Sequence, residues 1–260
     1  MVFIDKIKFY TKLFVKPVLD SFRVPIAKLI HTNGDYFCPL CEFKVTRFLT
    51  YSGRQHSKCP VCNSLQRHRL DWIFMERHTN LASPDPKKLL HVAPEESLAR
   101  NFKALSHIDY VSADLNNPRA MVKMDITDIQ YPDNSFDIIY CSHVLEHVPN
   151  DRKAISEFLR VLKPEGWALL KVPMFAEKTF EDPSISTAKD RKKHYGQFDH
   201  VRACGPDYID RIIETGFDAE TVLASDILSE EEGNTFGISL ERRIFYCKKN
   251  QNPKPLHDQV

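Results

Sequence analysis

The sequence predicts an α/β protein, in which a small cysteine-rich module precedes a doubly wound, mostly parallel sheet of seven strands. From residue 87 onward, short apolar runs alternate with segments of helical spacing, and this alternation favours a parallel sheet with helices on both faces. Before residue 80, four of the seven cysteines lie in two close pairs. Apolar residues form 42% of the chain, enough for the core of such a fold.

We expect four regions along the 260 residues. They are a basic amphipathic helical segment (1–33), the cysteine-rich module with a linking helix (34–80), the α/β domain (87–249) and a polar tail (250–260). No run approaches the roughly 20 apolar residues that cross a bilayer. No apolar stretch with a small-residue cleavage site opens the chain. These features favour a location in the cytoplasm.

Charge is divided unequally between the two ends of the chain. The net charge of the whole chain is +1. Residues 1–80 contain 13 Lys/Arg and 6 Asp/Glu, whereas the other 180 residues contain 23 Lys/Arg and 29 Asp/Glu. A basic first part indicates an anionic partner such as RNA, phospholipid or an acidic substrate, or else a solvated basic face.

The first thirty residues combine lysines with apolar residues at helical spacing. The apolar positions are Phe3, Ile7, Tyr10, Phe14, Val18 and Phe22. A basic, aromatic-rich helix can lie in a membrane interface. It can equally pack on its own protein or on a partner subunit, so peripheral membrane contact stays open.

The cysteine pairs read Cys38-Pro-Leu-Cys41 and Cys59-Pro-Val-Cys62, with seventeen residues between them. Zn²⁺ prefers four thiolates at tetrahedral corners, and two tight turns on a short hairpin deliver that arrangement. The alternative is two disulfides, which a reducing cytoplasm disfavours. We therefore expect a zinc ribbon, and its closed four-thiolate site would be structural.

The α/β domain follows from the apolar runs in chain order. Strands are expected at 88–93, 110–114, 122–125, 136–142, 167–172, 217–223 and 242–247, and helices at about 96–105, 152–162 and 206–215. Lys163-Pro-Glu-Gly166 and Gly216 are typical of helix ends. In such a sheet the ligand binds at the carboxyl ends of the strands.

One stretch of this domain resembles a known family. The run from Met124 to Pro149, with Phe136-Asp-Ile-Ile-Tyr-Cys-Ser-His-Val-Leu-Glu-His147 at its centre, and the run Glu157-Phe-Leu-Arg-Val-Leu-Lys-Pro-Glu-Gly-Trp167 are similar to class I S-adenosylmethionine-dependent methyltransferases. The likeness covers roughly residues 87–249 and is specific over 124–172. With the zinc ribbon, the architecture also resembles bacterial methyltransferases that carry an N-terminal zinc module, some of which modify ribosomal RNA.

The resemblance implies a Rossmann-like domain that binds S-adenosylmethionine. In the family, an acidic residue that ends the second strand binds the ribose hydroxyls, and Asp114 stands there. Asp125 with Ile126 matches the adenine-binding position after the third strand. Ser142 and His143, at the end of the fourth strand, would line the floor near the methyl group.

The turn after the first strand departs from the family. Relatives have a glycine-rich turn, which lets the backbone approach the cofactor closely. Here the turn is His91-Val-Ala93-Pro94-Glu95. Ala93 is small, but Pro94 and Glu95 replace flexible residues. We expect His91, Ala93 and Glu95 beside the methionine end, and the loss of cofactor binding remains an alternative.

Methyl transfer to oxygen requires alignment and a general base for the acceptor proton. The stretch from His143 to His147 is similar to one in ubiquinone-pathway O-methyltransferases that can hold a divalent metal. Here the ligands would be His143, Glu146 and His147, a set that suits zinc, iron or manganese. Metal-free relatives also share Leu-Glu-His at this place, so a catalytic metal is left open.

A second candidate region follows the fifth strand and contains His194, Asp199, His200 and Arg202. His200, with Asp199 nearby, is the preferred general base because histidine titrates near neutral pH. His147, His194 and Arg202 would contact the acceptor, Arg202 as a clamp for an anion. The alternative is a loop that merely covers the pocket.

Three functions remain from the sequence. The first is O-methylation of a small-molecule or sugar-containing acceptor by an S-adenosylmethionine-dependent methyltransferase. The second is RNA methylation, with the zinc ribbon and the basic first part holding RNA. The third is a binding protein with a decayed methyltransferase fold.

Overall fold

The structure is a computed structural model that describes residues 24–31 and 33–249. Residues 24–30 are helical. The remainder of the predicted amphipathic segment (1–23) and the predicted tail (250–260) lie outside the described residues, so the expected membrane contact stays a prediction. None of the described helices has the length and apolar character needed to cross a membrane.

The chain forms two compact units. The first runs up to Ala82 and includes Ala224–Arg242, and the second comprises Ser83–Leu223 and the chain from Arg243 onward. The break near residue 83 is close to the predicted one. Ala224–Arg242 was expected inside the α/β domain but belongs to the first unit, although it connects two strands of the second.

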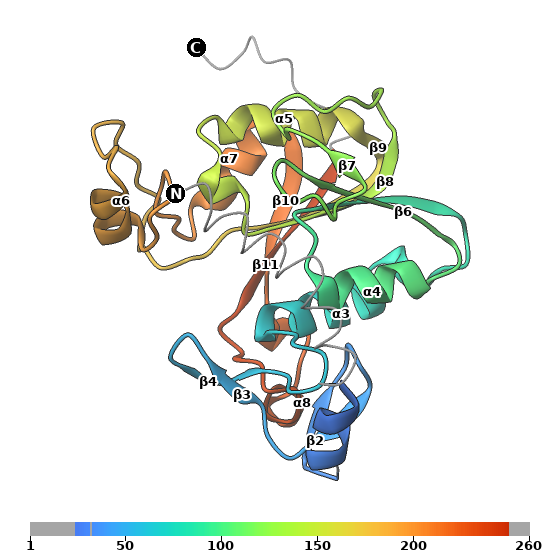
Figure 1. The fold of residues 1–260 in the computed structure, drawn as a ribbon. Coiled ribbons are helices and arrows are strands. Elements are labelled where there is room, and N and C mark those ends of the chain that lie inside the picture. The colour runs from blue at the N-terminus through green and yellow to red at the C-terminus, as the bar shows by residue number, and fades with distance from the viewer. Residues whose placement is uncertain (1–23, 32, 250–260) are drawn as a thin grey trace. The chain divides into compact units, whose positions relative to one another are not determined.

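The second unit is built on a seven-stranded sheet (Figure 1). In spatial order the strands are β10 (Phe217–Leu223), β11 (Arg243–Lys249), β9 (Leu162–Lys171), β8 (Phe136–Ser142), β5 (Lys87–Val92), β6 (Ile108–Asp114) and β7 (Val122–Lys123). The strands from β9 to β7 are parallel, and β11 is antiparallel to both neighbours. The predicted fold class is confirmed.

Helices cover both faces of this sheet (Figure 1), with α5 (Asp151–Val161) and α7 (Tyr208–Glu214) on one face and α4 (Glu96–Ala104) on the other. Asn150 is the N-cap of helix α5, and its side chain accepts a hydrogen bond from the Lys153 backbone N–H. Its residues at helical spacing form a completely buried stripe, namely Ala154, Ile155, Phe158 and Val161. This stripe joins the core of the sheet.

The same helix holds the loop that follows β7. Glu157 accepts hydrogen bonds from the Arg160 guanidinium through both carboxylate oxygens, each at 2.8 Å, and from the Ile129 backbone N–H at 2.8 Å. Arg160 also donates to the carbonyls of Ile129 and Tyr131. Since these bonds favour the ionised carboxylate, chiefly through Arg160, the pKa of Glu157 is lowered.

Besides the helical residues 24–30, the described part of the first unit contains two short hairpins and two further α-helices. The hairpins pair β1 (Tyr36–Cys38) with β2 (Phe43–Val45) and β3 (Leu49–Tyr51) with β4 (Arg54–Lys58). Helix α3 (Gln66–His78) follows the second cysteine pair, and α8 (Glu230–Phe236) lies in the Ala224–Arg242 segment. Helix α8 is not among the helices expected from the sequence.

Arg69 on α3 connects these pieces. It is completely buried, and its guanidinium donates to the carbonyls of Ser57, Ser64, Phe236 and Gly237 at 2.7–3.2 Å. The guanidinium carbon also lies 3.9 Å from the centre of the Phe48 ring. One side chain therefore joins the second hairpin, the second cysteine pair and the segment that contains α8.

Replacing Arg69 by Met should lower the free energy of unfolding by about 2–4 kcal/mol, because buried carbonyls lose their donor. Arg77→Met is the matched control on the same helix. It removes only an exposed ion pair to Glu232, which is worth less than about 1 kcal/mol. Urea unfolding of both variants tests this, and equal effects would contradict the role of Arg69.

Glu157→Gln should destabilise the protein at pH 7 by about 1–2 kcal/mol, through the weaker bonds to Arg160. The folded-state pKa of Glu157 lies below its unfolded value, so its contribution is present above the unfolded pKa and is lost as pH falls through the folded pKa. The two proteins should thus converge in stability from about pH 5 to pH 3. The control is Glu220→Gln, at an exposed position on β10. Urea midpoints across this range that keep a constant difference for Glu157→Gln would contradict the assignment.

Candidate functional site

The carboxyl ends of the parallel strands meet at one edge of the sheet. The Ala93 N–H, just after β5, donates to the Ala113 carbonyl of β6 at 2.8 Å, and the Met124 N–H donates to the Asp114 carbonyl at 3.1 Å. Ser142 at the end of β8 lies opposite Lys171 of β9. The structure therefore brings Ala93, Asp114 and Ser142, all predicted cofactor residues, to the same edge.

Two residues at this edge have left-handed backbones. Ala93 has φ of 48° and His143 has φ of 57°, a conformation that residues other than glycine rarely adopt. Ala93 thus takes the backbone shape that glycine would supply, with only a methyl group added. Such strain is concentrated at functional sites, and here it follows directly after β5 and β8.

Asp114 is half-buried and holds the turn that follows β6. Its Oδ1 accepts the backbone N–H groups of Asn116 and Asn117, both at 2.7 Å. Asp125 is exposed, and its Oδ1 accepts the Thr127 N–H and hydroxyl at 2.8 Å. These bonds lower the pKa of Asp125. Both aspartates are therefore fixed by their own turns and keep a second carboxylate oxygen for a ligand.

A buried hydroxyl without a hydrogen-bond partner among the described residues lies at this edge of the sheet. Ser142 is 3% exposed, and its hydroxyl has no hydrogen-bond partner among the described residues. Ile126, on the loop after β7, is buried. These groups fit S-adenosylmethionine. The carboxylates can accept hydrogen bonds from the ribose hydroxyls, Ile126 offers an apolar contact for adenine, and the Ser142 hydroxyl would lie under the reacting end.

His91 lies in the core beneath this edge. It is completely buried, with Nδ1 3.1 Å from the Tyr110 hydroxyl and Nε2 3.0 Å from Glu95 Oε2. Its ring also contacts Phe102 and Tyr140. Burial raises the pKa of Tyr110, so that hydroxyl keeps its proton. His91 therefore positions Glu95, which is the side chain of the pair nearer to solvent.

A second group of side chains surrounds Glu146, which lies in the short 3₁₀ turn η3 (Leu145–His147) and is 1% exposed. Its Oε1 lies 3.5 Å from His143 Nδ1 and 3.9 Å from His147 Nε2. His147 Nδ1 lies 3.4 Å from Asp199 Oδ2, and the rings of His147 and His200 pack edge to face at 4.7 Å. The structure thus brings together two candidate regions that are separate in the sequence.

The expected role of His200 as general base meets a geometric difficulty. His200 is 6% exposed, and its Nδ1 lies 3.0 Å from the Tyr195 carbonyl. Burial is the largest influence and lowers the pKa of His200. By contrast, the His143 side chain is 32% exposed and follows β8 directly.

The predicted acceptor contacts of Arg202 and His194 stay predictions, and their surroundings count against them. Arg202 is 1% exposed and donates to the carbonyls of Leu145, Val148 and Pro149 and to Glu181. These bonds hold the turn that carries Glu146. His194 is exposed on helix α6 (Ala188–Tyr195).

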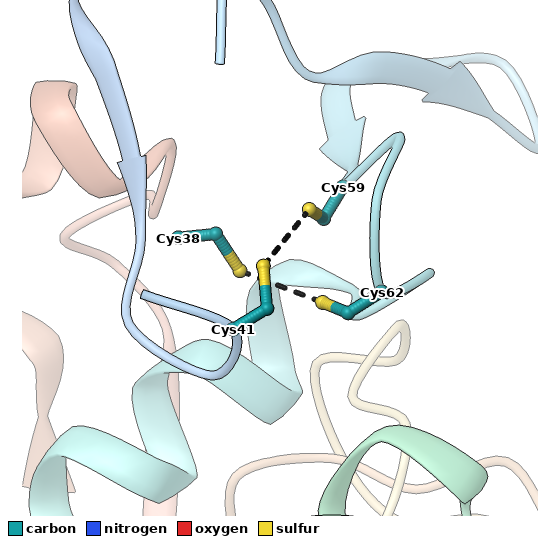
Figure 2. Close-up of side chains that lie close together, drawn as sticks. All are labelled: Cys38, Cys41, Cys59 and Cys62. Atoms are coloured by element: carbon teal, nitrogen blue, oxygen red, sulfur yellow. Dashed lines mark hydrogen bonds between the residues drawn. The ribbon is translucent and has the colours of Figure 1, made fainter. Parts of the chain in front are cut away.

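The four cysteines of the first unit converge on one point (Figure 2). The Cys38 and Cys62 sulfurs are 3.6 Å apart, and those of Cys41 and Cys59 are 3.8 Å apart. Four sulfurs bound tetrahedrally at 2.3 Å from one Zn²⁺ would lie about 3.8 Å apart. Bonds among the thiols lower the pKa of Cys38 and Cys62 and raise that of Cys41 and Cys59. All seven cysteines are free, so the disulfide alternative is absent from the structure.

Ser64, two residues after the second cysteine pair, is a member of this site that was not predicted. Its hydroxyl lies 3.3 Å from the Cys38 sulfur and 3.1 Å from the Cys62 sulfur. A hydroxyl there can donate to thiolates that bind a metal. No spacing rule in the sequence distinguishes it from other serines.

Comparisons with known proteins match part of this chain to methyltransferases. Residues 92–170 match the family model described as "Methyltransferase domain". The sterol 4-C-methyltransferase strm-1 of Caenorhabditis elegans is 26% identical over 157 residues, which are 60% of this chain and 42% of that protein. The uncharacterized methyltransferase YcgJ of Bacillus subtilis is 38% identical over 74 residues, 28% of each chain. The YcgJ crystal structure has a TM-score of 0.46 at 19% identity, covering 71% of this chain and 99% of that one. The stretches aligned by sequence cover less than half the length of these two curated relatives, 42% and 28% respectively.

Proposed function

We infer that this chain, which carries a class I S-adenosylmethionine-dependent methyltransferase domain, transfers a methyl group from that cofactor to an oxygen of a small-molecule or sugar-containing acceptor. The observation that carries this proposal is the shared sheet edge, where Asp114, the left-handed Ala93 turn and the unused Ser142 hydroxyl lie together. In this proposal, S-adenosylmethionine lies across the ends of β6, β5 and β8, with its ribose at Asp114, its methionine part at the Ala93 turn and its reacting end at Ser142. The cofactor supplies the methyl group on a sulfonium, and the protein supplies alignment.

Proton removal from the acceptor is assigned to His143 in this proposal. It follows β8 next to Ser142, its side chain is partly open to solvent, and Glu146 lies 3.5 Å from its Nδ1. Glu146 can thus orient the ring so that Nε2 faces the acceptor. His200, the base expected from the sequence, is less accessible than His143.

The first unit holds one structural Zn²⁺ in this proposal, bound by Cys38, Cys41, Cys59 and Cys62. The sulfur separations of 3.6 and 3.8 Å match the edge of a zinc tetrahedron. Four protein ligands leave no position for a substrate, so the ion supports folding.

RNA is the second candidate acceptor, and one feature of the first unit favours it. Arg242 lies close to Arg54, Arg67 and Arg69, and burial first, then this crowding, lowers the pKa of Arg242 to about 10. Arg69 is buried, but Arg54 is exposed and Arg67 is half-buried, and guanidinium groups open to solvent can bind a phosphate backbone. Binding of RNA that does not weaken steeply with salt would count against this candidate.

Calorimetry with S-adenosylhomocysteine tests the cofactor site. Asp114→Ala should weaken binding about 10–100-fold, because the ribose loses charged hydrogen-bond acceptors. Asp109→Ala, at an exposed position on the same strand, should leave the affinity unchanged. Equal affinities for Asp114→Ala and the unmodified protein would remove the proposed site. No binding by the unmodified, zinc-loaded protein would favour the decayed fold instead.

Metal analysis tests the zinc ribbon. We expect one Zn²⁺ per chain that survives a mild chelator, and its loss in Cys59→Ser, because three thiolates no longer close the tetrahedron. Cys247→Ala, in the core of the sheet, should keep that ion. Retention of the ion by Cys59→Ser would exclude this ligand set.

A further inference from the structure

Three side chains of the second unit place metal-ligand atoms close together. They are Glu146 and His147 on η3 and His200 after α6, and their ligand atoms all lie within 4.8 Å of one another. A backbone hydrogen bond of 2.9 Å, from the Val201 N–H to the Glu146 carbonyl, joins the two segments. The cluster is therefore formed by the fold, not by the sequence order of the ligands.

Each histidine has Nδ1 beside an oxygen acceptor, which leaves Nε2 as its ligand atom. The Tyr195 carbonyl can only accept a hydrogen bond, so His200 Nδ1, 3.0 Å away, carries the proton and Nε2 carries the lone pair. His147 Nδ1 lies 3.4 Å from the Asp199 carboxylate, and its Nε2 lies 3.9 Å from Glu146 Oε1. A carbonyl or carboxylate behind each imidazole is the usual support of a metal-binding histidine.

The turn that carries two of these ligands is held rigidly. Arg202 donates to the carbonyls of Leu145, Val148 and Pro149 at 2.6–3.0 Å. Arg202 is itself fixed by Glu181 at 2.9 Å and by Asp151 at 3.4 Å. A buried guanidinium with these partners fixes the backbone on both sides of Glu146, as a preorganised binding site requires.

We propose that Glu146, His147 and His200 bind one divalent first-row transition ion, such as Zn²⁺, Fe²⁺ or Mn²⁺. Two imidazoles and one carboxylate suit these ions better than Ca²⁺ or Mg²⁺, which prefer oxygen ligands only. Three protein ligands leave a position open, and an oxygen of the acceptor would occupy it. That last role rests on the proposed methyl transfer, whereas metal binding itself does not.

The full chain is loaded with zinc and then treated with a mild chelator, so that only the four-cysteine site keeps its ion. It is then titrated with Mn²⁺, and the electron paramagnetic resonance signal reports the free Mn²⁺. Mn²⁺ prefers oxygen and nitrogen donors, so the four thiolates do not compete for it. We expect one bound Mn²⁺ per chain. Glu146→Gln should lose this binding, and Asp199→Asn should weaken it about 10–100-fold, because the support of His147 is reduced.

His194→Ala is the matched control for metal binding, since His194 is an exposed histidine of the same segment. Its Mn²⁺ affinity should equal that of the unmodified protein. Absence of a bound Mn²⁺, or equal affinity in Glu146→Gln, would overturn the proposal. Asp199 is 44% exposed, so Asp199→Asn keeps the test valid if Glu146→Gln does not fold. Calorimetry with S-adenosylhomocysteine on the same samples reports the cofactor site separately, which distinguishes failure of the metal site from failure of the proposed function.

Discussion

The parallel pairing of β5, β6 and β8 is the constraint on which the candidate site depends. Their register places Val92 opposite both Ala113 and Cys141, so all three strands end at one edge. A slip of one residue would turn each side chain to the other face of the sheet. Buried apolar residues on both faces specify this register. The turns that follow can therefore present polar side chains without contributing to the core.

Beyond this edge, buried ionic groups hold the loops in place. Arg202 connects the turn after β8 to Glu181 and Asp151, and Arg69 does the same for the hairpin and helix segments of the first unit. Both guanidinium groups satisfy backbone carbonyls that helices and strands do not use. Removal of such a group leaves several buried acceptors unsatisfied. Irregular segments of this chain are therefore ordered by single arginines.

The strands of the sheet could be predicted from the sequence because continuous apolar runs such as 136–142 are typical of strands that are buried on both faces. It did not predict α8, since Glu230–Phe236 has little apolar periodicity and is held by the Ser229–Glu232 capping box and by the neighbouring Arg69 contacts. Strand β9 begins at Leu162, before the expected helix-terminating turn, because α5 ends directly in the strand. The sequence predicts Arg202 as an acceptor contact and His200 as the base, but the burial of both depends on tertiary contacts between segments far apart in the chain. Local spacing carries no signal for those contacts.

The proposed function requires a nucleoside sulfonium to bind across the ends of β5, β6 and β8. A crystal structure of the protein grown with S-adenosylhomocysteine would locate this ligand. We expect ribose hydroxyls within hydrogen-bond distance of the Asp114 carboxylate, adenine near Asp125 and Ile126, and the sulfur above Ser142. Density for the ligand elsewhere, or a strand edge closed by the Glu95 side chain with no ligand, would contradict it.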